Sequence, residues 1–131
     1  MKKILFAILL ALSSGVTHAD GIRGVVVQGN GDRAQFERAL RLASNMHEVL
    51  PKAKFEVVIF GPTVKLLDAF GPEATLIGRV QREGIQVIAC GRSLKTDHVD
   101  EGDLAPDVRV VPFGAVHILK RQHQGWEYFK P

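Results

Sequence analysis

The sequence predicts an α/β fold: a three-layer α/β/α sandwich around a mostly parallel sheet of about five strands. Short apolar segments rich in β-branched residues alternate with segments of helical periodicity along most of the chain. The apolar segments lack the strict in-and-out alternation of a sheet with one wet face. Both faces of the strands are therefore expected to be buried, as they are in parallel sheets that helices cover on each side.

The first 19 residues predict a secretory signal peptide. Lys2 and Lys3 precede an apolar run at 4–12, and small and polar residues follow up to Ala19. The run is too short to span a bilayer, which takes ~20 apolar residues. We expect cleavage after Ala19, a single domain at 20–131, a periplasmic location, and no membrane attachment once the leader is removed.

Composition excludes several classes of protein. The chain has 17 Lys and Arg against 14 Asp and Glu, and removal of Lys2 and Lys3 leaves 15 against 14. Because this nearly neutral domain lacks a basic stripe with interleaved aromatic residues, a nucleic-acid partner is not expected. With 46% hydrophobic residues over its full length, the chain can form a core without metals, and its single cysteine rules out an internal disulfide.

The sequence of the first half of the domain predicts two units, each a strand followed by a helix. An apolar run at 22–28 predicts the first strand, and the turn at 29–31 ends it. Asp32 and Gln35 have the spacing of a capping box, which starts a helix. Its apolar face consists of Phe36, Leu40, Ala43, Met46 and Leu50. A second strand at 55–60 stops at Gly61, and Pro62 allows a short helix to begin there.

The second half continues the alternation. A helix at 73–83 ends at Gly84, and a third strand at 85–89 runs directly into Cys90. The polar segment 96–107 is expected to be a solvated loop with a helical turn. A fourth strand at 108–111, a helix at about 114–124 and a short strand at 126–129 complete the chain.

The carboxyl ends of the strands are the expected site, because ligands of open parallel sheets bind there. The segments 28–32, 61–63, 90–95 and 112–114 should meet at this edge, and Cys90 is the strong nucleophile among them. The amides of a helical turn at 92–95, with its two cations, would favour the thiolate. The cleft around the cysteine is expected to contain Gly91, Arg92, Ser93, Asn30 and Gly61. An inert, buried cysteine is the alternative.

Cofactor and metal motifs are weak. Gly29, Gly31 and Ala34 match a permissive dinucleotide fingerprint, but the second strand lacks the acid that would bind a ribose. We interpret this stretch as a strand-to-helix turn. His47, His98, His117 and His123 show no metal-ligand spacing, so neither a cofactor nor a metal is expected. His98 is either an acid/base partner of Cys90 or a surface residue.

The stretch Ala89-Cys90-Gly91-Arg92-Ser93-Leu94, together with 57–62 and a tail with Gln122, Gly125 and Trp126, resembles the DsrE/DsrF-like family. The resemblance covers nearly all of the domain. It implies a small α/β domain that assembles into trimers or hexamers. In the sulfur-relay members the strand-end cysteine accepts a sulfane sulfur as a persulfide, and here that role falls on Cys90.

These observations lead to two main hypotheses. The first is a periplasmic DsrE-like sulfur carrier or thiol sensor, at most a sulfurtransferase-like relay, which forms a persulfide or mixed disulfide on Cys90 with a donor or acceptor protein. The second is a non-catalytic oligomer that binds a small ligand or anion at the strand ends and has an inert cysteine. A metal chaperone that uses Cys90 and histidines is a third. The aromatic tail, with Trp126 and Tyr128, is expected to serve structure or a subunit interface.

Overall fold

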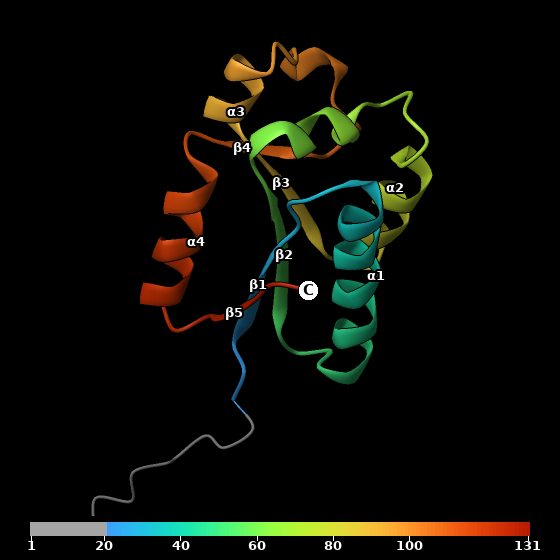
Figure 1. The fold of residues 1–131 in the computed structure, drawn as a ribbon. Coiled ribbons are helices and arrows are strands. Elements are labelled where there is room, and N and C mark those ends of the chain that lie inside the picture. Colours follow the sequence, from blue (N-terminus) through green and yellow to red (C-terminus); the bar gives the residue numbers. More distant parts are fainter. Residues whose placement is uncertain (1–20) are drawn as a thin grey trace, which may run out of the picture.

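Five parallel strands form one sheet in the order β4-β3-β2-β1-β5, as the computed structural model shows (Figure 1). The structure describes residues 21–131, and the predicted signal peptide at 1–19 lies outside this range. The predicted α/β fold with five strands is confirmed. The elements are β1 (Gly24–Gln28), α1 (Arg33–Val49), β2 (Lys54–Ile59), η1 (Gly61–Leu67), α2 (Ala74–Arg82), β3 (Gln86–Cys90), α3 (Gly91–Thr96), η2 (Glu101–Asp103), β4 (Arg109–Val111), α4 (Gly114–His123) and β5 (Glu127–Phe129).

The three central strands are buried on both faces, as the sequence predicted. Val25 and Val27 of β1 belong to the larger core cluster, which α1, α2 and η1 cover. Val26, between them, points to the opposite face and packs in a smaller cluster with Ile118 of α4. Because successive side chains of a strand point to opposite faces, a continuous apolar run serves both cores at once.

The helix α1 begins where the capping box predicted. The Asp32 carboxylate accepts the Gln35 amide at 2.8 Å, and the Gln35 side chain accepts the Asp32 amide at 2.8 Å. Phe36 and Leu40 are fully buried on the face that packs against the sheet. This local motif fixes the first turn of α1 and therefore directs its apolar face inward.

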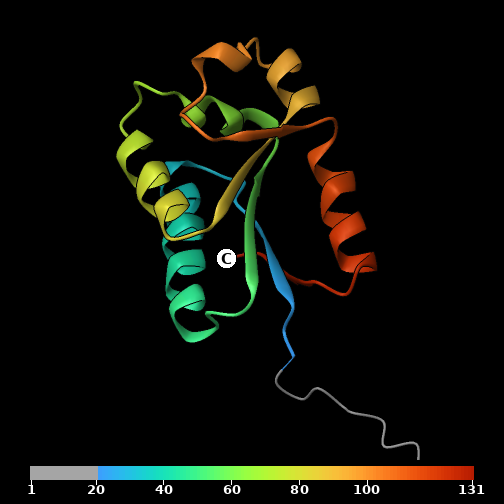
Figure 2. The same cartoon turned by 180° about the vertical axis from the view of Figure 1, so that it is seen from behind.

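The two outer layers of the sandwich are unequal. The helices α1 and α2 cover one face of the sheet, whereas α4 is the helix on the other face (Figures 1 and 2). The ten residues of α4 pack over the half of this face that lies toward the carboxyl ends of the strands, where Val58, Ile88 and Val111 meet Ile118. Toward the starts of the strands, the same face carries the polar side chains of Lys54, Glu56 and Gln86.

The short helices and the edge strand add details that the sequence did not predict. The short helix after Pro62 is a 3-10 helix, η1, and η2 is a second one inside the polar segment. The edge strand β5 is exposed along its whole length, but Trp126 just before it packs onto Gly24. In the described part of the chain, none of the helices has both the length and the apolar character needed to cross a membrane.

Candidate functional site

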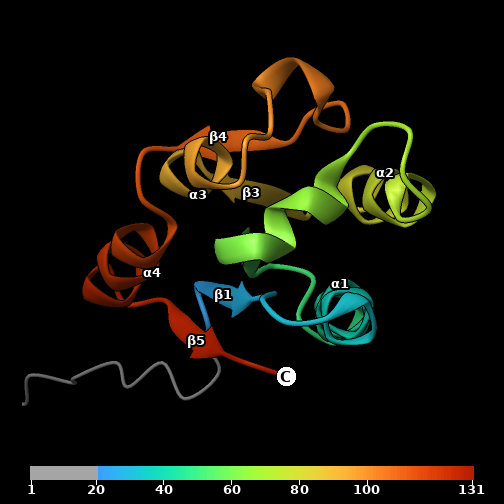
Figure 3. The same ribbon diagram turned by 45° about the horizontal axis from the view of Figure 1, so that its top comes forward.

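The loops at the carboxyl ends of the strands are joined by hydrogen bonds, and the four segments expected at this edge come together (Figure 3). The Asn30 side chain accepts the Phe60 amide at 3.2 Å and donates to the Phe60 carbonyl. Thr63 donates to the Gly31 carbonyl at 2.8 Å and accepts the Gly31 amide at 3.0 Å. These paired hydrogen bonds hold the β1–α1 loop and the β2–η1 loop side by side.

Cys90 lies at the centre of this edge. It is the last residue of β3 and the N-cap of α3, and 1% of its surface is exposed. A Cβ placed on Gly114, the first residue of α4, would lie 3.0 Å from the Cys90 Cβ. The absence of a side chain at Gly114 therefore allows the start of α4 to approach the cysteine closely.

The surroundings of Cys90 favour the thiolate. Burial raises the pKa of the Cys90 thiol, but donors to the sulfur outweigh it: the Gly114 amide, the Ser93 hydroxyl, and the amides of Ser93 and Arg92. The pKa of Cys90 consequently lies below its ordinary value of 9.0. Hydrogen bonds to the charged form lower the pKa of an acid, and amides at helix starts are well placed to donate them.

Ser93 connects the cysteine to the rest of the site. Its hydroxyl oxygen accepts the Gly61 amide at 2.8 Å. Because the oxygen is used as an acceptor there, the hydroxyl proton remains for donation to the Cys90 sulfur. Asn30 supports the same loop through Phe60, the residue before Gly61. Asn30, Gly61 and Ser93, which the sequence placed near the cysteine, therefore belong to one network around it.

Gly91 and Arg92 lie beside the cysteine on the side of β4. The Arg92 guanidinium lies 5.3 Å from the centre of the Phe113 ring. A surface groove here is lined by Gly91, Arg92, Leu94, Lys95, Val99, Glu101 and Pro112. The groove passes next to Cys90 without including it, since the sulfur is buried. His98 lies on the surface after α3, with a positive φ of 55°.

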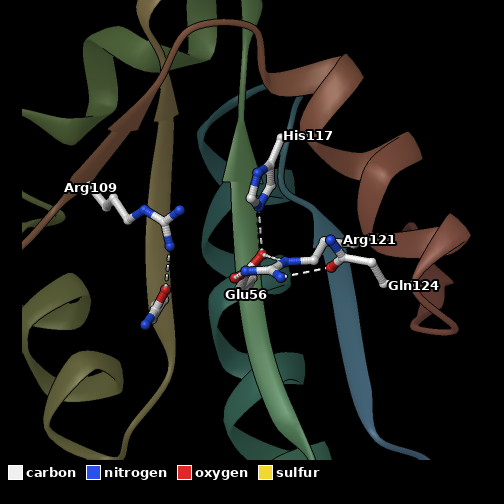
Figure 4. Close-up of polar contacts among 6 residues, drawn as sticks. Glu56, Arg109, His117, Arg121 and Gln124 are labelled. Carbon is white, nitrogen blue, oxygen red and sulfur yellow. Dashed lines mark hydrogen bonds and ion pairs between the residues drawn. The ribbon is translucent and has the colours of Figure 1, made fainter.

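Sequence reasoning missed a buried ionic cluster on the α4 face. Glu56 of β2 is 2% exposed, and its Oε2 lies 2.7 Å from His117 Nε2 and 3.0 Å from Arg121 Nε (Figure 4). Burial raises the pKa of Glu56, but the hydrogen bonds and charges of Arg121 and His117 outweigh it, so the pKa lies below 4.5. An acid inside an apolar strand, facing a helix with a basic pair four apart, was the available signal.

The histidines of the described segment form no cluster of three metal-ligand side chains with Cys90. Across residues 21–131, no three side chains of the types His, Cys, Asp and Glu come close enough together to hold a metal ion. His117 is committed to Glu56. At the strand ends, the described residues surround the Cys90 sulfur with amide donors and a hydroxyl donor.

Fold and site together define a parallel α/β domain with one cysteine of lowered pKa at the end of a central strand. The profile of the DsrE/DsrF-like family matches residues 24–131, and the chain belongs to this family. The resemblance inferred from the sequence is thereby confirmed. No curated protein matches the chain.

Solved structures share the fold. A protein of unknown function from Methanobacterium thermoautotrophicum, MTH1491, is 28% identical, with a TM-score of 0.71 over 85% of this chain and 100% of its own. The ychN protein from E. coli is 12% identical, with a TM-score of 0.73 over 83% of this chain and 99% of its own. At the latter identity the similarity concerns the fold alone.

Proposed function

We propose that this protein is a periplasmic sulfur carrier or thiol sensor that works through a persulfide or mixed disulfide on Cys90. The observation that carries the proposal is the set of donors around the sulfur, from Gly114, Ser93 and Arg92, which lower the thiol pKa despite burial. Membership of the DsrE/DsrF-like family supports a sulfur-related role. A nucleophilic thiolate at near-neutral pH is the chemical requirement for either activity.

The carrier cycle needs two exchanges and no external oxidant. The Cys90 thiolate attacks the outer sulfur of a donor persulfide, so that a new S–S bond forms and the S–S bond of the donor breaks, with the donor thiolate leaving. An acceptor thiolate then attacks the outer sulfur on Cys90, and the Cys90 thiolate leaves. The same hydrogen bonds that stabilise the attacking thiolate also stabilise it as the leaving group of the second step.

The burial of Cys90 determines where access must open. The start of α4 lies against the cysteine through Gly114, and Arg92 packs on the neighbouring Phe113. Movement of the segment 112–114 away from α3 would uncover the sulfur with the sheet left in place. We propose that a donor or acceptor protein, or another subunit of a trimer or hexamer, induces this opening.

Intact-protein mass spectrometry under non-reducing conditions tests the proposal. The purified protein is measured before and after treatment with an inorganic polysulfide, with Cys90→Ser as the matched variant. We expect the wild type to gain the mass of one sulfur, which a reductant removes, and the variant to gain none. Equal loading of the variant, or no loading of a folded wild-type protein, would rule out the carrier.

One observation favours a second candidate, a binding module with an inert cysteine. Only 1% of the Cys90 surface is exposed, which is typical of cysteines that serve as small apolar core residues. Alkylation with iodoacetamide distinguishes the two. A thiol that reacts in the native protein at a rate far above that expected from global unfolding supports the carrier, whereas reaction only in denaturant supports the inert cysteine.

A further inference from the structure

A second polar site lies on the α4 face, at the end of the strands opposite Cys90. A groove there is lined by Pro51, Lys52, Ala53, Lys54, Phe55, Glu56, Gly84, Gln86, Arg109, Arg121 and Trp126. Four of these side chains are cationic and one is anionic. Gln86 begins β3 and Cys90 ends it, so the groove is about 13 Å from the thiol along the strand, at ~3.3 Å per residue. The persulfide chemistry does not use it.

Strand geometry places the polar side chains on one surface. Lys54 and Glu56 are two apart on β2 and therefore point to the same face. Gln86 is the register partner of Glu56, and Arg109 is the partner of Ile88, two residues after Gln86. Arg109 donates to the Gln86 amide oxygen at 3.3 Å, which directs its guanidinium toward the groove.

The single acid of the groove is already neutralised. Glu56 accepts Arg121 Nε at 3.0 Å and Arg121 Nη2 at 2.5 Å, and its Oε2 also bonds His117 at 2.7 Å. Within residues 21–131, no carboxylate oxygen lies within 4.0 Å of the charged nitrogens of Lys52, Lys54 or Arg109. The groove therefore has an excess of positive charge with no partner in the described part of the chain.

Arg121 is held rigidly at one wall of this groove. Glu56 fixes one edge of its guanidinium, Gln124 accepts from Nη1 at 2.9 Å, and the group stacks 4.4 Å from the centre of the Trp126 ring. Figure 4 shows Arg109 on one side and the Glu56–Arg121 pair on the other, over the same face of the sheet. Burying a carboxylate costs free energy that an apolar residue at the same position would not cost. At Glu56 the buried carboxylate orients the Arg121 guanidinium at the groove, which is typical of a functional site.

We propose that this groove binds a small tetrahedral oxyanion of the sulfate or phosphate type between Arg109 and Arg121. Arg109 supplies the guanidinium hydrogens that Gln86 leaves free, and Lys54 adds an exposed ammonium group at the rim. Guanidinium groups donate paired hydrogen bonds to such anions. A bound dianion would also neutralise the excess positive charge of the groove. This groove is a different site from the strand-end cleft near Cys90.

A two-dimensional ¹H–¹⁵N NMR titration with sodium sulfate tests the site, with sodium chloride used to keep the ionic strength constant. Sulfate is a dianion throughout the usable pH range, so its charge does not change during the titration. We expect saturable shifts at the amides around Lys54, Gln86 and Arg109, with millimolar or tighter affinity. Shifts that do not saturate, or that centre on the helix starts near Cys90, would overturn the proposal.

Two variants and one matched control make the test specific. Arg109→Gln and Lys54→Gln each remove one exposed cation of the groove, and we expect Arg109→Gln to weaken sulfate binding at least about tenfold, since it removes a paired donor. Arg38→Gln removes the same charge from the exposed surface of α1, on the other side of the sheet, and should leave the affinity within about twofold. Equal losses in Arg109→Gln and Arg38→Gln would show that only net charge matters, and would refute a defined site.

Discussion

Replacing Gly114 by alanine is the most direct perturbation of the thiol site. The new Cβ would lie 3.0 Å from the Cys90 Cβ, 3.3 Å from Val58 Cγ1 and 3.4 Å from the Phe60 Cβ. Two of these atoms are β-carbons fixed to the backbone, so they cannot rotate away. The start of α4 must therefore move off the cysteine, and its amide must move with it.

The expected cost follows from two opposing effects. Inserting a methyl group into a packed site costs ~1–3 kcal/mol, whereas alanine in place of glycine stabilises a helix interior by up to ~1 kcal/mol. Gly114 is the first residue of α4, where the helical gain is smaller. We therefore expect a net destabilisation of about 1–2 kcal/mol, and a pKa of Cys90 above that of the wild type because the Gly114 amide is displaced.

Urea denaturation measures the stability, and thiolate absorbance at 240 nm as a function of pH measures the titration of Cys90. With a slope of ~1.5 kcal/mol per molar urea, the unfolding midpoint should fall by about 1 M. Gly78→Ala is the matched control. Its new Cβ meets the end of the flexible Arg82 side chain at 3.3 Å in the middle of α2, so it should stabilise the protein slightly and leave the thiol unchanged.

A Gly114→Ala variant that is as stable as the wild type, with an unchanged thiol titration, would refute the reasoning. Such a result would mean that α4 accommodates the methyl group without moving, and that the Gly114 amide is not what stabilises the thiolate. A loss of stability with an unchanged titration would separate the two claims and leave Ser93 and Arg92 as the effective donors.

Three further predictions concern other parts of the molecule. Ser93→Ala should raise the pKa of Cys90 because a hydroxyl donor is lost, and Ser93→Thr should restore it. A lower midpoint of the thiolate titration at 240 nm in the alanine variant would contradict this. Glu56 has a folded-state pKa below 4.5, so its stabilising effect is complete above that pH and is lost as the pH falls through the folded value. Glu56→Gln should lower the free energy of unfolding by about 3 kcal/mol or more at pH 7 and should reduce the loss of stability at acid pH. Urea denaturation at several pH values measures both effects, and parallel stability profiles of wild type and variant would contradict the prediction. Phe36→Ala should cost ~3–5 kcal/mol by calorimetry, since the ring is fully buried.

Local sequence patterns predicted the elements well because their causes are local. The capping box of Asp32 and Gln35 depends on residues three apart, and it starts α1 where expected. The apolar run of β1 is buried on both faces because helices cover a parallel sheet on each side. The position of Cys90 at the end of β3 follows in the same way, from a strand that ends where a helix begins.

The contacts that give the sites their chemistry were not visible in this way. Glu56 bonds His117 and Arg121, which are 61 and 65 residues away in the chain. The sequence shows an acid in an apolar strand and a basic pair four apart in a later helix, but their pairing depends on where α4 crosses β2. The same applies to the cationic groove, where β2, β3 and β4 bring Lys54, Gln86 and Arg109 onto one surface.

The sequence by itself determined the alternation of strands and helices, the family, and the placement of a lone cysteine at a strand end, because periodicity, caps and short motifs act over a few residues. Only the tertiary structure decided that the Cys90 sulfur is buried and that Gly114, on a later helix, donates to it. Burial and hydrogen bonding between distant segments depend on how helices settle on the sheet. That packing follows from the whole set of side-chain volumes rather than from any one stretch of sequence.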